Sequence, residues 1–219
     1  MGAIIRAHDL TVRRMGEQAL LLEVDDPEQV GALYAQLLAA RADGTLGGGP
    51  TEIVPAARTV LLDGVPKPAA LAELLAGWSV AATAPTDGPL LELPTVYDGA
   101  DLVDVAAHWG VSPADAVRLH SAIEYRVAFC GFAPGFGYLT GLPPERAVPR
   151  RATPRPSVPA GSVAVAGRYT GVYPSASPGG WQLLGRTEAR LWDTAREPAA
   201  LLAPGTRVRF VPVAGSADA

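Results

Sequence analysis

Gly131-Phe-Ala-Pro-Gly-Phe-Gly-Tyr-Leu-Thr-Gly-Leu-Pro143 holds four glycines, two prolines and three aromatic residues in thirteen positions. Glycine admits positive φ and close backbone approach, whereas proline fixes φ and removes a hydrogen-bond donor. The stretch is therefore not an ordinary core element, and it predicts a shaped loop with exposed aromatic surface. A second segment of the same chemistry follows at Gly167–Gln182. Together the two segments indicate a built site in the second half of the chain.

Length and composition bound the class of protein. The chain has 219 residues, of which 48% are hydrophobic and 18% are charged, with 24 glycines and 21 prolines. This length suits two domains, and the glycine and proline content favours short strands joined by turns. The net charge of -4 does not favour binding to the negatively charged backbone of a nucleic acid. With one cysteine and no long apolar run, we expect a soluble cytoplasmic protein without disulfides and without a membrane partner.

The first half of the chain predicts an α+β domain. Apolar residues recur at helical spacing from Val30 to Leu38, directly after the helix-start signal Asp26-Pro27. The predicted order is strand, helix, strand, strand, helix, strand, at residues 18–24, 27–43, 52–55, 58–63, 71–78 and 90–93. This order is the split βαβ pattern of a ferredoxin-like sandwich, so we predict a ferredoxin-like domain over residues 1–94.

The second half predicts two short helices followed by a barrel. Residues 100–109 and 113–120 have the pattern of helices around Gly110, the second capped by Ser112. As a DNA reader this pair is poor because its second helix lacks a basic flank, so we interpret it as a packing pair. Short apolar runs punctuated by turns then continue to the end of the chain, which predicts a small β-barrel domain over residues 95–219.

Several familiar kinds of site are absent from the sequence. It contains no P-loop, no Gly-x-Gly-x-x-Gly dinucleotide fingerprint and no Gly-x-Ser-x-Gly nucleophile elbow. The three histidines do not stand at metal-ligand spacing with Cys130, so we predict no metal site. Any nucleotide would have to bind in another way.

Ordered motifs across the second half match a known family. They are Val96–Gly99, Leu119-His120, Glu124-Tyr125, Gly131-Phe132, Pro134–Phe136, Pro149-Arg150, Pro154-Arg155, Val158–Val163, Thr170-Gly171, Tyr173-Pro174, Ser177–Trp181 and Gly185–Thr187. With these motifs the chain closely resembles the family of the 5-oxoprolinase B subunit, also known as allophanate hydrolase subunit 1 or the KipI-type kinase inhibitor. The first half agrees only in its order of elements.

The resemblance implies a fold, an activity and partners. The barrel would be cyclophilin-like, and it would share an active site with the homologous C subunit, which is similar to allophanate hydrolase subunit 2. The activity would be ATP-dependent opening of 5-oxoproline to glutamate, with the hydrolysis completed by a third 5-oxoprolinase subunit. ATP, with or without Mg²⁺, would be a co-substrate bound jointly with the partner, and the chain alone would be nearly inactive. Which residues bind ATP is not implied.

Three positions depart from the family pattern. Gly137 stands before Tyr138 where the family usually has proline, and Tyr169 stands where glutamine commonly precedes Thr-Gly. Ser157 replaces a residue that is often arginine. Glutamine and arginine are side chains that contact a small amide or carboxylate, so the substrate could differ from 5-oxoproline.

Three side chains are candidates for catalysis. His120 ends a predicted helix, where it could cap the helix or act as an acid, a base or an anion donor. Arg150 and Arg155 each follow a proline, so they could project rigidly toward a phosphate or carboxylate or simply lie solvated on the surface. The resemblance favours a site role for all three.

A wider set of residues is predicted to shape the pocket and bind the substrate. They supply aromatic walls, backbone donors of Gly-rich turns and small polar groups. The set is Phe132, Pro134, Gly135, Gly161, Ser162, Tyr173, Pro178, Gly179, Gly180 and Gln182. Phe136 and Tyr138 stay open between pocket wall, barrel core and partner contact.

More than one function agrees with these features. The first is the subunit of a lactam-opening enzyme described above. Alternatives are a regulatory module that docks on a sensor histidine kinase and a subunit of the allophanate hydrolase or urea carboxylase type. Peptidyl-prolyl isomerisation rests on analogy between barrels alone and ranks last.

Overall fold

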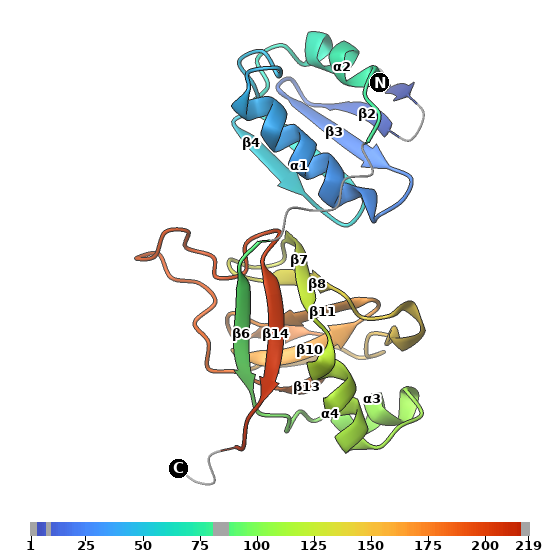
Figure 1. The fold of residues 1–219 in the computed structure, drawn as a ribbon, viewed down its shortest axis with the longest axis vertical. Coiled ribbons are helices and arrows are strands. Elements are labelled where there is room, and N and C mark those ends of the chain that lie inside the picture. Colours follow the sequence, from blue (N-terminus) through green and yellow to red (C-terminus); the bar gives the residue numbers. More distant parts are fainter. Residues whose placement is uncertain (1–3, 8–9, 81–87, 216–219) are drawn as a thin grey trace. The chain divides into compact units, whose positions relative to one another are not determined.

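The computed structural model describes residues 4–7, 10–80 and 88–215, which belong to two compact units (Figure 1). Unit 1 spans Met1–Thr86 and unit 2 spans Asp87–Ala219. Each unit has hydrophobic clusters of its own, one in unit 1 and two in unit 2 among the described residues. Each unit therefore has the buried apolar surface that an independent fold requires.

Unit 1 is an antiparallel sheet with two helices. Its elements are β1 (Ile4–Ala7), β2 (Leu10–Met15), β3 (Ala19–Val24), α1 (Gln29–Ala42), β4 (Glu52–Pro55), β5 (Thr59–Asp63) and α2 (Pro68–Ala76). The strand order is β1-β2-β3-β5-β4. Alternate residues of β3 are buried, and they join Leu33 and Leu37 of α1 in one cluster. The predicted amphipathic stripe thus covers this sheet.

The strand predicted at residues 90–93 does not close this sheet, and that prediction was wrong. The strand lies in unit 2 as β6 (Leu90–Thr95), where it pairs in parallel with β14 (Arg207–Pro212). In unit 1 the neighbour of β3 on the side away from β5 is instead β2, which precedes β3 in the chain. The order β3-β5-β4 keeps the pairing of a split βαβ unit, and the ferredoxin-like name for unit 1 stays a prediction.

Unit 2 is a nearly closed barrel of mixed strand direction. Besides β6 and β14 it contains α3 (Leu102–His108), α4 (Pro113–Ala122), β7 (Tyr125–Cys130), β8 (Gly137–Thr140), the 3-10 turn η1 (Pro144–Arg146), β9 (Arg155–Val158), β10 (Ser162–Ala166), β11 (Tyr169–Val172), β12 (Ser177–Gly179) and β13 (Gln182–Arg186). Seven strands follow the order β13-β10-β11-β8-β7-β14-β6. Figure 1 shows β6 and β14 side by side along the barrel wall.

Hydrogen bonds between β13 and the residues that follow β6 bring the two edges of the sheet together along a seam. The N–H of Val96 donates to the carbonyl of Arg186 over 2.9 Å, and the N–H of Arg186 donates back over 2.8 Å. Farther along the seam, the N–H of Gly99 donates to Leu184 over 3.1 Å. A Cβ at Gly99 would lie 2.4 Å from the carbonyl oxygen of Leu183, so the seam requires glycine at this position.

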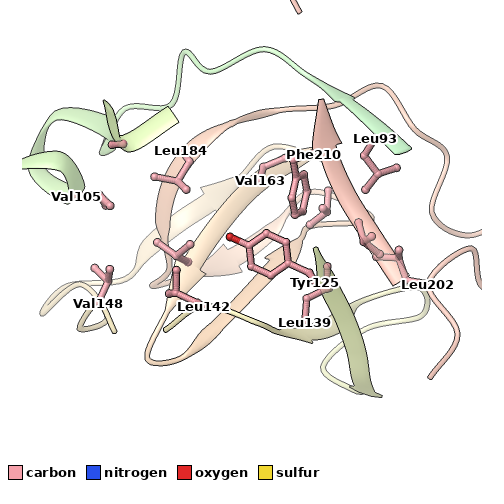
Figure 2. Packing of buried hydrophobic residues seen from close by; sticks show 14 of the residues in the cluster. Leu93, Val105, Tyr125, Leu139, Leu142, Val148, Val163, Leu184, Leu202 and Phe210 are labelled. Carbon is pink, nitrogen blue, oxygen red and sulfur yellow. The ribbon is translucent and has the colours of Figure 1, made fainter. Parts of the chain in front are cut away.

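The two short helices pack against the barrel, as predicted. α3 packs on α4 and β13, while α4 lies against β14. Ser112 caps α4, because its hydroxyl accepts from the N–H of Asp115 over 3.1 Å. Inside the barrel, Tyr125 and Phe210 lie edge to face at 5.5 Å between ring centroids (Figure 2). The helix pair thus packs as part of the barrel unit, with Val105, Ala106 and Ala116 in its hydrophobic cluster.

Two strands of unit 2 stand outside the main sheet. β9 and β12 pair with each other in an antiparallel ribbon, with Gly179 opposite Arg155 and Ser177 opposite Val158. We call this pair the β9–β12 ribbon. Val158 is fully buried, which attaches one end of the ribbon to the barrel. The ribbon carries part of the second Gly-rich segment and so brings it toward the first.

Candidate functional site

The two Gly-rich segments meet at a cavity of about 230 Å³. We call it the aromatic pocket. It is lined by Phe132, Phe136, Tyr138, Arg150, Pro154, Tyr173, Pro178, Gly179, Gly180 and Trp181. The walls come from the loop before β8, from β8 itself, from the segment before β9, from the residue after β11, and from β12 and the turn after it. Six of the residues predicted as site residues lie in this lining: Phe132, Arg150, Tyr173, Pro178, Gly179 and Gly180.

The ring of Phe136 lies at the centre of the pocket's aromatic wall. It makes edge-to-face contacts with Tyr138, Trp181 and Tyr173, at 5.1, 5.3 and 5.5 Å between ring centroids. Its side chain is 1% exposed, so the rings around it have little freedom to move. Edge-to-face packing of this kind adds stability beyond area burial.

Phe132 occupies a strained position at the pocket rim. Its φ is +68°, which makes it the sole non-glycine residue with positive φ in the described part of the chain. Its side chain is 61% exposed, with the ring 5.3 Å from that of Phe136. The tight turn is held by hydrogen bonds from Ala133 to Gly131 over 2.8 Å and from Phe136 to Ala133 over 2.9 Å. Strained residues of this kind concentrate at functional sites.

Tyr173 presents a protonated hydroxyl beside the pocket. Burial raises the pKa of this phenol, while the backbone N–H of Trp181 and the charges of Arg150 and Arg155 act in the opposite direction. The net change is upward, so Tyr173 keeps its proton at neutral pH and is able to donate a hydrogen bond. A Cβ on Gly179 would lie 2.3 Å from the Tyr173 hydroxyl oxygen, so glycine is required there.

Arg150 is the pocket's available cation. It is exposed, lines the cavity and makes no side-chain hydrogen bond or ion pair with any residue that the structure describes. Its charge acts on the Tyr173 hydroxyl, which lies on the same pocket wall. An unpaired guanidinium beside aromatic faces is suited to a carboxylate or phosphate group.

Arg155 is placed differently, because its partner is a buried carboxylate. Its Nη2 donates to Asp101 Oδ1 over 2.8 Å, and Nη1 of Arg151 donates to the same oxygen over 2.8 Å. The Asp101 side chain is 2% exposed, and its other oxygen accepts from the N–H of Leu183 over 2.7 Å. Burial raises the Asp101 pKa, yet the hydrogen bonds from Arg155 and Leu183 and the two arginine charges outweigh this, so the pKa is lowered.

His120 does not reach the pocket. Its side chain is completely buried, with its ring against those of Tyr97, Tyr125 and Phe210. Nδ1 lies 2.7 Å from the Tyr97 hydroxyl, and burial lowers the pKa of the imidazole to about 3. The predicted proton transfer would need contact with a ligand, which this position does not offer. His120 faces inward because it lies one turn after buried Ala116 on α4.

The remaining predicted residues lie beside the pocket without lining it. The N–H of Gly161 donates to the Tyr173 carbonyl, and the Ser162 hydroxyl donates to Pro159, so both belong to a turn below the pocket. Gln182 donates to the carbonyl of Pro149 over 3.2 Å and so holds the residue before Arg150. Pro134 and Gly135 form the loop itself, and a Cβ on Gly135 would meet Trp192 at 3.0 Å.

Of the three departures from the family pattern, Gly137 and Tyr169 lie away from the cavity. Gly137 begins β8, and a Cβ there would lie 3.1 Å from Leu202 and 3.3 Å from Val127, on the barrel side of the strand. Tyr169 packs edge to face on Tyr138 at 5.7 Å, behind the lining. Ser157 is an exposed residue of the β9–β12 ribbon. None of the three lines the aromatic pocket.

Sequence reasoning missed three residues of this region. Asp101 has the local pattern of a helix start, yet it holds two arginines that follow it by about 50 positions. Trp181 and Pro154 also line the pocket, although neither was among the predicted site residues. The sequence signal that could have pointed to this region is the proline-rich run that leads into β9, because it contains Arg150, Arg151 and Arg155.

Neither a membrane span nor a metal cluster occurs in the described chain. No helix in residues 4–7, 10–80 or 88–215 has the length and apolar character to cross a membrane. The same ranges contain no group of three or more His, Cys, Asp or Glu side chains arranged to hold a metal ion.

Comparison with known structures supports the barrel assignment. The chain aligns with the crystal structure of TTHA0988 at a TM-score of 0.74 and 36% identity, covering 92% of this chain and 41% of that one. It also aligns with Kluyveromyces lactis urea carboxylase at a TM-score of 0.70, covering 97% of this chain and 23% of that one. Identity in the second case is 17%, so it is evidence of the fold alone.

Comparison of sequences identifies the family. The 5-oxoprolinase B subunit of Escherichia coli O157:H7 is 46% identical over 146 residues, which are 65% of this chain and 67% of that protein. The 5-oxoprolinase B subunit of Haemophilus influenzae is 43% identical over 137 residues, 61% of this chain and 64% of that protein. The match thus spans about two thirds of these relatives. Residues 10–202 match the model of the carboxyltransferase domain, subdomain C and D, and the chain therefore belongs to this family.

Proposed function

We propose that this chain is a 5-oxoprolinase subunit that binds a small lactam carboxylate in the aromatic pocket. The observation that carries the proposal is the unpaired Arg150 beside the faces of Tyr173 and Trp181. Relatives at 43% to 46% identity bear the name of the 5-oxoprolinase B subunit, and that name agrees with the chemistry of this pocket.

The size of the pocket favours a small ring over a nucleotide. Its volume of about 230 Å³ is below the range of about 300–1,000 Å³ that holds drug-sized ligands. A five-membered lactam with one carboxylate fits these dimensions, with its ring against the aromatic wall and its anion toward Arg150. ATP would need surface beyond this cavity, and in the proposal the homologous C subunit supplies that surface.

Each polar group of the pocket has a role in the proposed reaction. To open the amide, the lactam carbonyl oxygen attacks the γ-phosphorus of ATP and ADP leaves, and cationic donors stabilise the negative charge on the transferred phosphoryl oxygens. Arg150 binds the carboxylate or the transferred phosphoryl group. The Tyr173 hydroxyl donates to the carbonyl oxygen, which its raised pKa makes possible at neutral pH. On a third subunit, water then adds to the activated carbonyl carbon, phosphate leaves and the ring C–N bond breaks, which gives the open-chain product.

The proposal extends to the fold and the assembly. The barrel would be of the cyclophilin-like type, and the barrel of the C subunit would complete the site around the exposed ring of Phe132. The relatives are named as one subunit of an enzyme, which agrees with an assembly of several chains. This chain alone would then turn over ATP very slowly or not at all.

Phosphate release from ATP tests the proposal. It is measured with this chain, with the C subunit and with the third subunit, separately and mixed, with and without 5-oxoproline. We expect release that depends on the lactam only in the mixture. A properly assembled mixture whose ATP turnover ignores the lactam would contradict the proposal and favour a docking function without chemistry. Co-purification of a partner of about twice the mass of this chain would support the proposal.

A further inference from the structure

The β9–β12 ribbon supplies part of the wall of the aromatic pocket, and it is attached to the barrel at one end through the buried side chain of Val158. Its two strands pair only with each other among the described strands. A two-stranded ribbon is marginally stable by itself in water. The ribbon and the turn after it nevertheless supply Pro178, Gly179 and Gly180 to the pocket lining. Something outside the ribbon must therefore hold this wall in place.

Asp101 lies where the barrel seam and the ribbon meet. Its backbone N–H donates to the carbonyl of Leu183 over 3.0 Å, and its Oδ2 accepts from the N–H of Leu183 over 2.7 Å. Its Oδ1 accepts from both Arg151 and Arg155. One oxygen is thus bound to the seam, and the other to the arginines that lead into and begin β9.

The two arginines carry this attachment to both strands of the ribbon. Arg155 is the first residue of β9 and stands opposite Gly179 of β12. The backbone N–H of Arg151 donates to the carbonyl of Gly180 over 2.8 Å. The backbones of both arginines thus contact the part of the pocket wall on which Gly179 and Gly180 lie.

The charges of Asp101, Arg151 and Arg155 depend on one another for compensation. One buried carboxylate faces two guanidinium groups, so the three side chains carry a net charge of one positive unit. Nη1 of Arg155 and Nε of Arg151 are buried without a hydrogen-bond partner, so the shared oxygen of Asp101 carries most of the compensation. Asp101 is the buried member of the group, whereas the side chains of Arg151 and Arg155 are 35% and 21% exposed. Removal of the arginine charges would leave a buried carboxylate without compensation, which is strongly destabilising.

We infer that Asp101 is a positioning residue that fixes the β9–β12 ribbon, and with it one wall of the aromatic pocket, through Arg151 and Arg155. Arg155 then holds the wall and Arg150 is left to meet the ligand. The inference rests on the proposed function only for the identity of the substrate in the pocket. The attachment of the ribbon by Asp101 is a property of the chain without ligand.

Hydrogen–deuterium exchange of the full chain tests the attachment. In Asp101→Asn, an amide cannot accept from both arginines and from Leu183 at once. We expect amides in residues 151–158 and 177–183 to exchange about tenfold faster or more, with β10 and β11 unchanged. Asp98→Asn is the matched control, since Asp98 also lies near the seam and pairs with Arg186, but both side chains are about half exposed. The ribbon should stay protected in this control.

A second variant keeps the test decisive if Asp101→Asn does not fold. Arg155→Met removes one of the two guanidiniums and leaves Asp101 paired with Arg151. We expect faster exchange in the same two segments. Normal protection of the ribbon in folded Asp101→Asn, or in Arg155→Met if only that variant folds, would overturn the inference. Faster exchange spread evenly over unit 2 would also overturn it, because it would show a general loss of stability.

Kinetics of the assembled enzyme then test whether Asp101 acts by positioning the pocket wall or by contacting the lactam. In Asp101→Asn we expect the KM for the lactam to rise about tenfold, with a smaller change in kcat, because a displaced wall weakens binding first. An unchanged KM together with a loosened ribbon would overturn the link from ribbon to pocket. Absence of any lactam-dependent turnover in the unsubstituted enzyme would contradict the proposed function instead, and the exchange result would stand.

Discussion

Arg150 and Arg155 have the same local sequence, a proline followed by arginine, but the fold gives them opposite surroundings. Arg155 shares the buried carboxylate of Asp101, whereas Arg150 lines the pocket without a partner in the described chain. The local pattern predicts an anion ligand at both positions, because a Pro-Arg pair carries no information about a carboxylate 54 positions away from Arg155. The division of labour between these arginines was therefore not predictable from the local pattern.

The role of Arg150 gives a prediction for activity. In the assembled enzyme, Arg150→Met should raise the KM for an anionic lactam about tenfold or more, since a charge-assisted hydrogen bond is lost. The free energy of unfolding should change by less than about 0.5 kcal/mol, as expected for an exposed side chain without partners. Steady-state kinetics and calorimetry measure the two effects. Arg14→Met, at an exposed position of unit 1, is the control.

A neighbouring pair of glycines gives a prediction for packing. Gly179→Ala places a methyl group 2.3 Å from the Tyr173 hydroxyl, so the ring or the ribbon has to move. We expect a loss of about 1–3 kcal/mol in the free energy of unfolding, together with weaker lactam binding. Gly180→Ala is the matched control, because its nearest atom would lie at 3.7 Å. Equal behaviour of the two variants in denaturant titrations would argue against this packing.

His120 gives a prediction for pH. Burial lowers its pKa to about 3, from an ordinary value of 6.5. Between these pH values the unfolded chain binds a proton that the folded barrel does not, so the free energy of unfolding rises with pH across this window. Above about pH 6.5 the His120 ring is neutral in both the folded and the unfolded chain, so its burial takes nothing from the free energy of unfolding. As the pH falls below this value, the free energy of unfolding decreases.

Nuclear magnetic resonance of ¹³C-labelled histidine provides the measurement for His120. We expect its ring signals to stay those of a neutral imidazole from about pH 8 down to about pH 5, which is below the usual range for histidine. The spectrum of His120→Gln assigns the signals. A midpoint near about pH 6.5 would show that the ring is accessible, and it would restore the role in proton transfer.

Among the helices and strands, the predictions that succeeded were those that depend on residues close together in the sequence. The helices predicted at 100–109 and 113–120 are present as α3 and α4. For α4 the signals are a serine cap and a proline at the first position, which act within one turn. The strand at 90–93 also exists, but it belongs to the other sheet. Its partner β14 lies more than 110 positions later, and a short apolar strand does not encode which edge it joins.

The assignment of β6 to the barrel predicts where a core substitution acts. Leu93 is 1% exposed and belongs to the barrel cluster. Leu93→Ala should destabilise unit 2 by about 2–5 kcal/mol while unit 1 keeps its stability. Leu75→Ala, at a fully buried position of α2, should have the converse effect. Hydrogen exchange resolved by segment distinguishes the units, and loss of protection in unit 1 for Leu93→Ala would contradict the assignment.

At the scale of the molecule, the sequence predicted that two domains exist and that the site belongs to the second. The glycine and proline pattern predicted loops, and the aromatic pocket does form where the two unusual segments meet. What could not be predicted is the surroundings of each side chain, as His120 shows. Its family motif is compatible with a catalytic role, yet its place on α4 directs it into the core.

The parallel pairing of β6 with β14 has a consequence for how the protein is made. β6 opens the described part of unit 2, and β14 lies between it and β7 in the sheet. The strands of unit 1 all end by Asp63, so that sheet can form early on the ribosome. The barrel must wait until Pro212 has emerged, and until then β6 and β7 each lack a neighbour. Nascent chains paused within this interval should be the species that chaperones retain.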